Sequence, residues 1–239
     1  MEIKIAHLYY DLLNLYGEQG NVTALVNALN KQKLSLKVDL LTIGDKIDFQ
    51  EYDLFYLGCG SEENLFIVLD DIKKYKKQIK EVINKGKFFI STGNSRELFG
   101  KYIELNNQRY KALSIFDYYA LQNIYTRIVG ESFMEFEQLS KPIIGFQNRE
   151  CIIQNGNKGL FKLIKGYADN YSASYEGHHE NNFFGSYLLG PLLIRNPHFT
   201  DYIVKNLLKS KDIKYNNIKD TYEHRAYEEY IKNFYENES

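Results

Sequence analysis

This sequence lacks most of the features that place a chain in a specialised class of protein. No stretch of its 239 residues approaches roughly 18 consecutive apolar residues, the length that a membrane-spanning helix needs, so we expect no membrane insertion. The formal net charge is −1, which creates no strong field, and neither nucleic acid nor an anionic membrane is expected as a partner. The phosphate-binding patterns G-x-x-x-x-G-K-[ST] and G-x-G-x-x-G after a strand are absent, and no residues have the spacing of metal ligands. We therefore expect no cofactor and no metal.

Cysteine is scarce and tryptophan is absent. The two cysteines, Cys59 and Cys151, lie far apart in the chain, which favours free thiols over a disulfide in a cytosolic protein. The first residues run directly into a strand-like sequence and lack the long apolar core of a signal peptide, so the sequence predicts a cytoplasmic location. The aromatic residues are 21 tyrosines and 15 phenylalanines. We expect them at ordinary core and surface positions, although exposed aromatics are also typical of partner-binding faces.

The first hundred residues alternate between strand-like and helix-like patterns. Strands are predicted at residues 3–8, 36–43, 52–57 and 87–91, and helices from the N-cap Asn21 to about residue 33, over 62–85, and in a short segment through Leu98. This alternation is typical of a parallel sheet with helices on both faces, and ligands bind such sheets beyond the carboxyl ends of the strands. Any site is therefore expected where the loop at 9–20 meets the turns at 58–61 and 93–95.

The pattern changes at about residue 108, where shorter strands with few helices begin. Strands are predicted at 112–116, 126–129, 141–146 and 183–188, followed by two helices that start near Pro197 and near Asp220. These strands indicate a short antiparallel or mixed extension of the sheet. We expect residues 1–210 to form one domain and residues 211–239 to form a C-terminal helical extension of the same domain.

Four stretches of the chain together resemble one family. They are HLYYDLLNLYGEQGN at 7–21, the turn GCGSE at 58–62 after Asp53, IIGFQN at 143–148, and GSYLLGPLL at 185–193. In this order they resemble the glutaminase subunits of lipid II isoglutaminyl synthase, a branch of the cobyric-acid-synthase-like class I glutamine amidotransferases, over roughly residues 3–210. The resemblance implies a flavodoxin-like, three-layer α/β domain of the class I glutamine amidotransferase type. Such a domain has a central, mostly parallel sheet, a short antiparallel extension and C-terminal helices.

The resemblance also implies a catalytic cysteine and a catalytic histidine, and this sequence has neither. Glutamine hydrolysis proceeds by acyl transfer through a thioester, which needs a thiolate at a strand-to-helix elbow and a histidine that moves the proton. The family's elbow reads C-G-G-Y-Q-x-L-G, whereas this chain reads GNSRELFG at 93–100, so Gly93 stands at the nucleophile position. The family's Y-L-H-G-P reads YLLGP at 187–191, so Leu189 stands at the histidine position. Because leucine can neither accept nor donate a proton, loss of the pair implies a loss of several orders of magnitude in rate.

Parts of the glutamine pocket are expected to survive. The turn Gly58-Cys59-Gly60 and the neighbouring Asn94 are predicted to offer free main-chain N–H groups to a substrate. Arg127 aligns with a family arginine that places the substrate, and an arginine can hold a carboxylate through two parallel hydrogen bonds. A surface salt bridge is an equally good interpretation of Arg127.

Other candidate residues have simpler interpretations. Cys59, Ser91, Thr92 and Ser95 carry nucleophilic atoms near the elbow, but none is active without a nearby base. His178 and His179 are predicted to be exposed turn residues, His198 and His224 to be solvated on helices, and the lysine-rich run at 73–77 to form a solvated helix face. Cys151 is expected to be a small, partly buried side chain.

Three functional hypotheses follow from the sequence. The first is a relative that keeps the amidotransferase fold but cannot hydrolyse glutamine; its partner, implied by the resemblance, is a Mur-ligase-like, ATP-dependent amidating subunit in a heterodimer. The second is an active amidotransferase with a displaced nucleophile such as Cys59. The third is a module that binds glutamine or another amino acid near Arg127 without catalysis.

Overall fold

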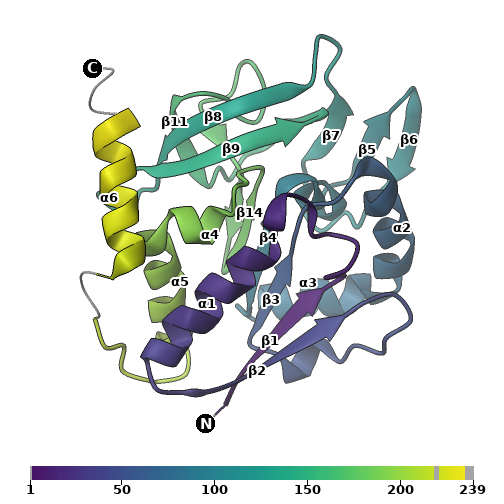
Figure 1. The fold of residues 1–239 in the computed structure, drawn as a ribbon. Coiled ribbons are helices and arrows are strands. Elements are labelled where there is room, and N and C mark those ends of the chain that lie inside the picture. Colours follow the sequence, from purple (N-terminus) through teal and green to yellow (C-terminus); the bar gives the residue numbers. More distant parts are fainter. Residues whose placement is uncertain (1, 218–220, 235–239) are drawn as a thin grey trace.

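A six-stranded sheet forms the centre of the molecule (Figure 1), in a computed structural model that describes residues 2–217 and 221–234. Its order is β13-β14-β4-β3-β1-β2, and every neighbouring pair is parallel except β13 with β14. The strands are β1 (Glu2–Leu8), β2 (Ser35–Leu41), β3 (Leu54–Leu57), β4 (Phe88–Thr92), β13 (His178–Glu180) and β14 (Phe183–Ser186). The predicted mostly parallel sheet is therefore confirmed.

Helices cover both faces of this sheet, as its two apolar faces require. One face packs against α1 (Gln19–Lys31), α4 (Leu192–Arg195) and α5 (Pro197–Lys209), and the other packs against α2 (Glu62–Ile72) and α3 (Lys76–Asn84). The helix α6 (Tyr222–Phe234) lies outside α5, where Tyr227 and Ile231 pack on Phe133 and Ile144. None of the helices within the described ranges combines the length and the apolar character needed to cross a membrane.

Two four-stranded sheets form the extension predicted after residue 108. Their orders are β10-β7-β5-β6 and β12-β11-β8-β9, and all of their pairs are antiparallel except β5 with β7. The strands are β5 (Tyr102–Leu105), β6 (Gln108–Lys111), β7 (Tyr119–Gln122), β8 (Ile128–Glu135), β9 (Ile143–Arg149), β10 (Cys151–Gln154), β11 (Phe161–Lys165) and β12 (Tyr175–Glu176). Figure 1 shows β8 and β9 crossing above the carboxyl ends of the central strands, so the extension covers the edge where a site was expected.

Three local predictions differ from the structure. The helix predicted over 62–85 is interrupted by a 3₁₀ turn at Lys73–Tyr75. The strand predicted at 112–116 is irregular, because the N–H groups of Leu113 and Ile115 donate to the carbonyls of Leu98 and Phe99 instead of to a strand. The first helix begins at Gln19, two residues before the predicted N-cap.

Asn21 has a structural role other than helix capping. Its buried amide donates to the Tyr56 hydroxyl at 2.7 Å and accepts the Leu193 N–H at 2.7 Å. Asn21 therefore joins α1 to β3 below it and to α4 beside it.

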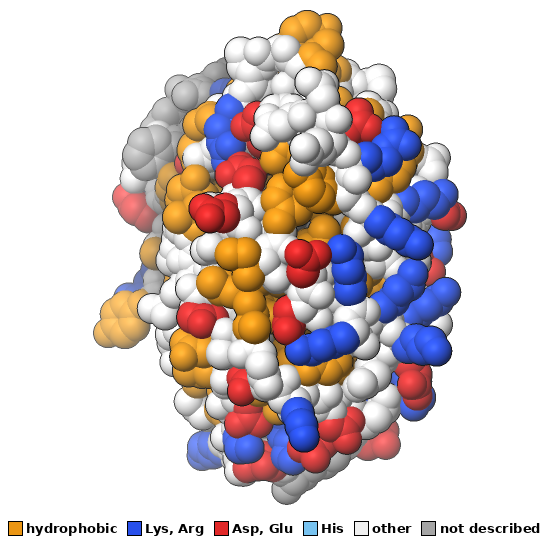
Figure 2. Space-filling model, turned by 90° about the vertical axis from the view of Figure 1, so that its right-hand side faces the viewer, with side chains coloured by type: hydrophobic (Ala, Val, Ile, Leu, Met, Phe, Trp, Pro, Cys, Tyr) orange, Lys and Arg blue, Asp and Glu red, His pale blue; other side chains and the backbone are white. Residues whose placement is uncertain are grey.

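The lysine-rich run lies on the surface, as predicted. Lys73 and Lys74 are exposed and pair with Asp70 and Asp71 at 3.1 and 2.7 Å. Figure 2 shows basic side chains gathered on one side of the face that carries α2 and α3, with acidic side chains among and below them. Surface pairs of this kind contribute little to stability, so the run is a solvated helix face.

Candidate active site

The strand-to-helix elbow predicted after β4 is present. Gly93 follows Thr92 with φ +65°, a left-handed conformation that costs a glycine nothing, and begins the 3₁₀ helix η4 (Gly93–Phe99). The residue at this position is therefore held in the sharp turn that exposes a nucleophile in elbow enzymes. Here the turn has no side chain.

Two neighbouring side chains fill the space beside Gly93. A Cβ atom built on Gly93 would lie 2.5 Å from Cβ and 2.6 Å from Sγ of Cys59, and 3.0 Å from Cδ2 of Leu189. Leu189 is fixed there because it exchanges two main-chain hydrogen bonds with Phe146 of β9. The structure therefore brings together the predicted positions Gly93, Cys59 and Leu189. The side chains of Cys59 and Leu189 lie where the side chain of a nucleophile at position 93 would start.

In the turn at Gly58–Gly60 the N–H groups of Cys59 and Gly60 are not free, contrary to the sequence-based expectation. The Gly60 N–H donates to Oδ1 of Asn94 at 3.2 Å, and the Asn94 amide donates back to the Gly60 carbonyl at 2.8 Å. The Cys59 N–H donates to the Glu18 carboxylate. A Cβ on Gly58 would lie 2.3 Å from the Leu13 carbonyl oxygen, so the turn packs too tightly against the 9–20 loop to admit a larger residue.

Arg127 combines the two interpretations that the sequence left open. Its guanidinium donates to Glu62 at 2.8 Å and to Glu150 at 3.0 Å, and it also bonds Asn148. These residues line the cleft above Cys59 and Asn94, so the salt bridge lies in the predicted pocket. The guanidinium N–H groups that would hold the carboxylate of a substrate are thus bonded to two carboxylates of the protein itself.

The cleft itself is nearly full. Its cavity volume is about 10 Å³, which is room for about one water molecule. The residues that line it are Tyr16, Cys59, Gly60, Glu62, Leu65, Phe66, Asn94, Glu97, Ile103, Leu105, Arg127, Asn148, Arg149, Glu150 and Cys151. No histidine is among these described residues, and no three metal-ligating side chains gather anywhere in the described part of the chain.

Buried carboxylates surround Cys59. Glu18 lies directly under the elbow, where it accepts hydrogen bonds from Tyr56 and Thr92, and burial raises its pKa to about 7. Burial also raises the pKa of the Cys59 thiol well above its usual value, and the charges of Glu18, Glu97 and Glu62 raise it further. With 2% of its surface exposed and acids for neighbours, Cys59 stays a neutral thiol at pH 7.

Glu97 is a site residue that the sequence did not single out. It stands where the family's elbow motif has glutamine, and it is buried between Tyr187, whose hydroxyl donates to it at 2.8 Å, and Cys151. Burial raises its pKa to about 7 from a usual value near 4.5. The signal that could have revealed it is a charged residue inside an otherwise uncharged motif.

The histidine prediction is wrong at three positions. His179 lies half-buried in β13, stacked on the ring of Phe184, rather than in an exposed turn, and the other two are His178 and His198. His178 is 3% exposed and packs on the rings of Phe116 and Tyr118, because β13 pairs with β14 and the 112–118 segment covers it. His198 is partly buried and contacts the Pro142 carbonyl at 3.1 Å. Burial lowers the pKa of the His178 and His198 imidazoles to about 4, so they are neutral at pH 7.

The crowding at the elbow predicts a strong coupling between Gly93 and Cys59. We expect Gly93→Ala to lower the free energy of unfolding by about 2–4 kcal/mol, because a left-handed alanine and an overpacked Cβ each cost roughly 1–3 kcal/mol. Cys59→Gly in the same chain should relieve at least about 1 kcal/mol of this loss. Denaturant unfolding of the two single variants and the double variant measures the coupling.

Gly17→Ala is the matched control for the backbone contribution. Gly17 has φ +74° and nothing within 4 Å of a built Cβ. The free energy of unfolding that Gly17→Ala loses therefore comes from the strained backbone alone, without a steric clash. Equal losses for Gly93→Ala and Gly17→Ala would show that Cys59 does not fill the space beside the elbow.

The buried Glu97 predicts a pH-dependent gain in stability for Glu97→Gln. A carboxyl whose pKa is raised from near 4.5 to about 7 in the folded protein stabilises the fold fully below pH 4.5 and loses that contribution as the pH rises through 7. Glutamine carries no charge, so Glu97→Gln should raise the free energy of unfolding by about 1–3 kcal/mol at pH 8.5 and by about zero at pH 5. Exposed Glu137→Gln serves as the control, and an equal gain at both pH values would contradict the assignment.

The fold and the elbow define the class of protein. A glutamine amidotransferase from Thermotoga maritima superposes with a TM-score of 0.51 at 13% identity, covering 89% of this chain and 86% of that one. The glutaminase domain of CTPS from Trypanosoma brucei, with bound acivicin, superposes with a TM-score of 0.55 at 10% identity, covering 92% and 98%. The chain therefore has the class I glutamine amidotransferase-like fold that the sequence predicted.

The sequence comparison then gives the family. Residues 4–197 match the CobB/CobQ-like glutamine amidotransferase domain, so the chain belongs to that family. Two relatives are 29% identical, and both are named lipid II isoglutaminyl synthase (glutamine-hydrolyzing) subunit GatD. The Streptococcus pneumoniae relative aligns over 213 residues, 88% of this chain and 82% of its own length, and the Staphylococcus aureus relative aligns over 215 residues, 90% and 88%. The predicted resemblance to this branch is confirmed.

Proposed function

We propose that this chain is a non-hydrolysing member of its family that acts as a subunit beside an amidating enzyme. The observation that carries the proposal is the crowding at the elbow, where Cys59 and Leu189 occupy the space in which the nucleophile's side chain would begin. Gly93 supplies no nucleophile and Leu189 supplies no proton acceptor. Both halves of the acyl-transfer machinery are thus replaced by residues that pack against each other.

An active enzyme with Cys59 as its nucleophile is the second candidate, and one observation favours it. Sγ of Cys59 lies 2.6 Å from the position of a Cβ on Gly93, so a thiol is present within a few ångströms of the expected place. A nucleophilic thiol, however, needs a histidine or a cation that lowers its pKa. Burial raises the pKa of Cys59 most, the charge of Glu18 raises it further, and the Asn94 N–H that bonds the thiol offsets only part of this rise. The surroundings of the thiol therefore favour the first candidate.

A module that holds glutamine or another amino acid at Arg127 is the third candidate. It needs an open cleft and a free guanidinium. The cavity volume of about 10 Å³ and the pairing of Arg127 with Glu62 and Glu150 both oppose it in this conformation.

The proposed partner is a Mur-ligase-like, ATP-dependent subunit that amidates a peptidoglycan precursor. Two lines support it: the two relatives carry the name of a subunit of lipid II isoglutaminyl synthase, and this chain exposes a hydrophobic patch near the elbow cleft. The patch is formed by Ile124, Tyr125 and Tyr171, which are 85%, 72% and 64% exposed. Tyr125 and Tyr171 are held edge to face, and the Asn123 amide donates to the Tyr171 hydroxyl at 2.7 Å. Rigid exposed tyrosines are typical of protein interfaces.

Co-purification tests the proposed partnership. The chain is expected to form a stable complex when it is co-expressed with a Mur-ligase-like subunit from the same genome, and Tyr125→Ser should weaken that complex at least ten-fold. Leu40→Ser, at a 55% exposed position on the distant β2, is the matched control and should leave the complex unchanged. A chain that stays a monomer beside every such subunit would refute the partnership.

A further inference from the structure

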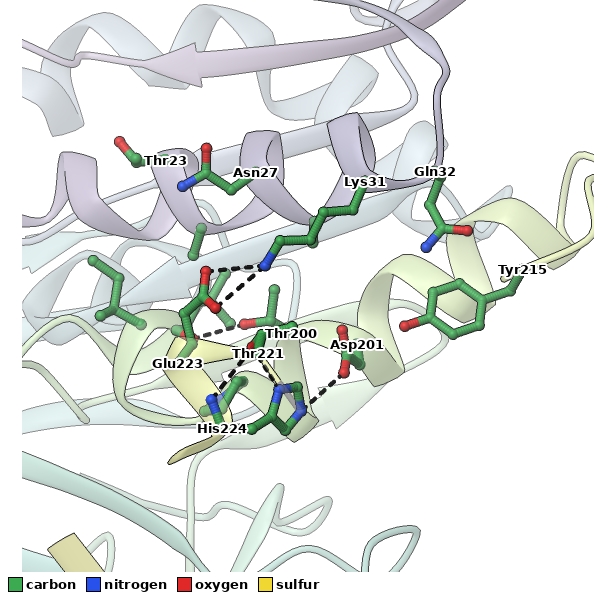
Figure 3. Close-up of a pocket in the computed structure, with 15 residues that line it drawn as sticks. Thr23, Asn27, Lys31, Gln32, Thr200, Asp201, Tyr215, Thr221, Glu223 and His224 are labelled. Atoms are coloured by element: carbon green, nitrogen blue, oxygen red, sulfur yellow. Dashed lines mark hydrogen bonds and ion pairs between the residues drawn. The ribbon is translucent and has the colours of Figure 1, made fainter. Parts of the chain in front are cut away.

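A second cavity lies outside the sheet, between α1, α5 and the start of α6, and shares no lining residue with the elbow cleft. Its volume is about 150 Å³, a size at which a protein cavity admits a molecule as large as benzene. Figure 3 shows its polar side chains converging from these three helices and from Tyr215 and Thr221. The lining includes Ala24, Ala28, Lys31, Leu193, Asp201 and Glu223.

The cavity lies beside a close contact between α1 and the start of α4. A Cβ atom on Gly20 would lie 2.8 Å from side-chain atoms of both Pro191 and Ile194, so nothing fits between these helices at that point. Further along α1 the facing residues are Ala24 and Ala28, whose small side chains leave the space between α1 and α5 unfilled. Leu193 and Pro197 complete an apolar inner wall. The inner part of the cavity therefore suits an aliphatic group.

The rim of the cavity is built from two polar pairs. Lys31 of α1 donates to both oxygens of Glu223 at 3.0 and 3.2 Å, and Nε2 of His224 lies 3.1 Å from Asp201 of α5 (Figure 3). Each pair joins α6 to a different helix. The ammonium of Lys31 and the carboxylates of Glu223 and Asp201 therefore face the cavity, and each can accept a further partner, because an ammonium has three donors and a carboxylate about four acceptor sites.

Tyr215 and Asn216 close the remaining side. The Gln32 amide donates to the Asn216 carbonyl at 3.0 Å and accepts the Asn216 N–H at 2.8 Å. This pair places Tyr215 at the cavity, where it bonds Asp201. The walls are thus fixed by polar contacts across three elements, which is the preorganisation that a ligand site needs.

We propose that this cavity binds a small apolar amino acid as a zwitterion, with its side chain against Ala24, Ala28 and Leu193. The ammonium group would be held by Asp201 and Glu223, and the carboxylate by Lys31. A ligand with a single charged group would bond only the carboxylates or only the lysine of the rim, whereas a zwitterion can bond both, as a further partner of groups that already face the cavity. The site is independent of the elbow, so its occupancy does not depend on whether glutamine is hydrolysed.

Calorimetric titration of the full chain with L-valine, L-leucine and L-alanine tests the proposal. We expect saturable binding of at least one of these, and at least ten-fold weaker binding of its three truncated analogues. For valine these are isobutylamine, which lacks the carboxylate, isovalerate, which lacks the ammonium group, and isobutanol, which lacks both charges. Absence of saturable binding for all three amino acids would overturn the proposal. Equal affinity for an analogue that lacks either charge would overturn the zwitterion assignment.

Two pairs of variants locate the site. Ala28→Leu fills the inner wall and should weaken binding at least ten-fold, whereas Ala226→Leu on the exposed side of α6 should not change it. Lys31→Met removes the cation and should weaken binding several-fold, whereas Lys77→Met on α3 should not. Thermal melting of each variant without ligand confirms that it is folded. Unchanged binding in both Ala28→Leu and Lys31→Met would refute this location.

Discussion

Replacement of Arg96 by methionine is expected to lower the free energy of unfolding by about 3–5 kcal/mol, enough to unfold a protein of ordinary stability. Arg96 is fully buried in η4, directly behind the elbow. Its guanidinium donates to both oxygens of Asp169, at 2.5 and 3.1 Å, and to Glu176 at 3.0 Å. Methionine preserves the volume but leaves two buried carboxylates without their cation. When one partner of a buried ion pair is removed, the other charge stays buried without a counter-charge. This costs far more stability than is lost when the whole pair is replaced by apolar side chains.

The Arg96 cluster also links the elbow to β14, which ends three residues before Leu189. Glu176 accepts the Tyr187 N–H at 2.6 Å and the Ser186 hydroxyl at 2.8 Å, so Arg96 fixes the end of β14 through it. Burial raises the pKa of Glu176, and loss of Arg96 removes the main opposing charge. The loss in Arg96→Met should therefore be smaller at pH 5, where Glu176 takes up a proton more readily, than at pH 8.

An exposed arginine provides the control for this prediction. Arg109 donates to Glu104 at 2.7 Å on the surface of β6, and Arg109→Met should change the free energy of unfolding by no more than about 0.5 kcal/mol. Denaturant unfolding of both variants at the two pH values gives the comparison. A loss below about 1 kcal/mol for Arg96→Met would contradict the structural role assigned to the buried cluster.

Glutamine turnover is expected to be at least about four orders of magnitude slower than that of a glutamine-hydrolysing family member assayed in parallel. The thioester route needs a thiolate. Cys59, the thiol beside Gly93, is buried near Glu18 and Glu97, burial likewise raises the pKa of Cys151, and no histidine is among the described residues of the cleft. Cys59→Ala should leave the residual rate unchanged, because the thiol takes no part in it. If the protein does hydrolyse glutamine and Cys59→Ala abolishes this turnover, Cys59 is the nucleophile and the second candidate function is correct.

A designed gain of activity separates a missing nucleophile from a missing pocket. The variant Cys59→Gly, Gly93→Cys, Leu189→His clears the space beside the elbow and supplies both catalytic groups. If crowding and the two lost side chains are the whole cause, this variant should hydrolyse glutamine measurably faster than the wild type. The single change Gly93→Cys should not, because Cys59 occupies the space that its side chain needs.

The positions of the elbow residues could be predicted from the sequence, but the packing between them could not. Gly93, Cys59 and Leu189 lie at the ends of β4, β3 and β14, and the carboxyl ends of adjacent parallel strands meet at one edge of a sheet. Sequence order and motif spacing therefore suffice to bring them together. The distance from Cys59 to the elbow depends on how tightly Gly58 packs on Leu13, which no local pattern encodes.

Buried polar residues were the main limit of the sequence-based predictions. Arg96, Glu97 and His178 look like surface residues when only their neighbours in the chain are considered. Arg96 is paired with Asp169 and Glu176, which lie more than 70 residues away, and His178 is covered by the 112–118 segment. Such contacts become visible only when the strands of the extension are placed over the central sheet.

Intact-mass measurement after incubation with a chloromethyl ketone analogue of glutamine tests the central claim most directly. This reagent alkylates a thiolate that lies at a glutamine site, so it reports the nucleophile and the pocket together. The structure predicts that the mass of the native protein stays unchanged, while iodoacetamide modifies both Cys59 and Cys151 once the protein is unfolded. A stoichiometric adduct on Cys59 of the native protein would contradict the claim and identify an active, displaced nucleophile.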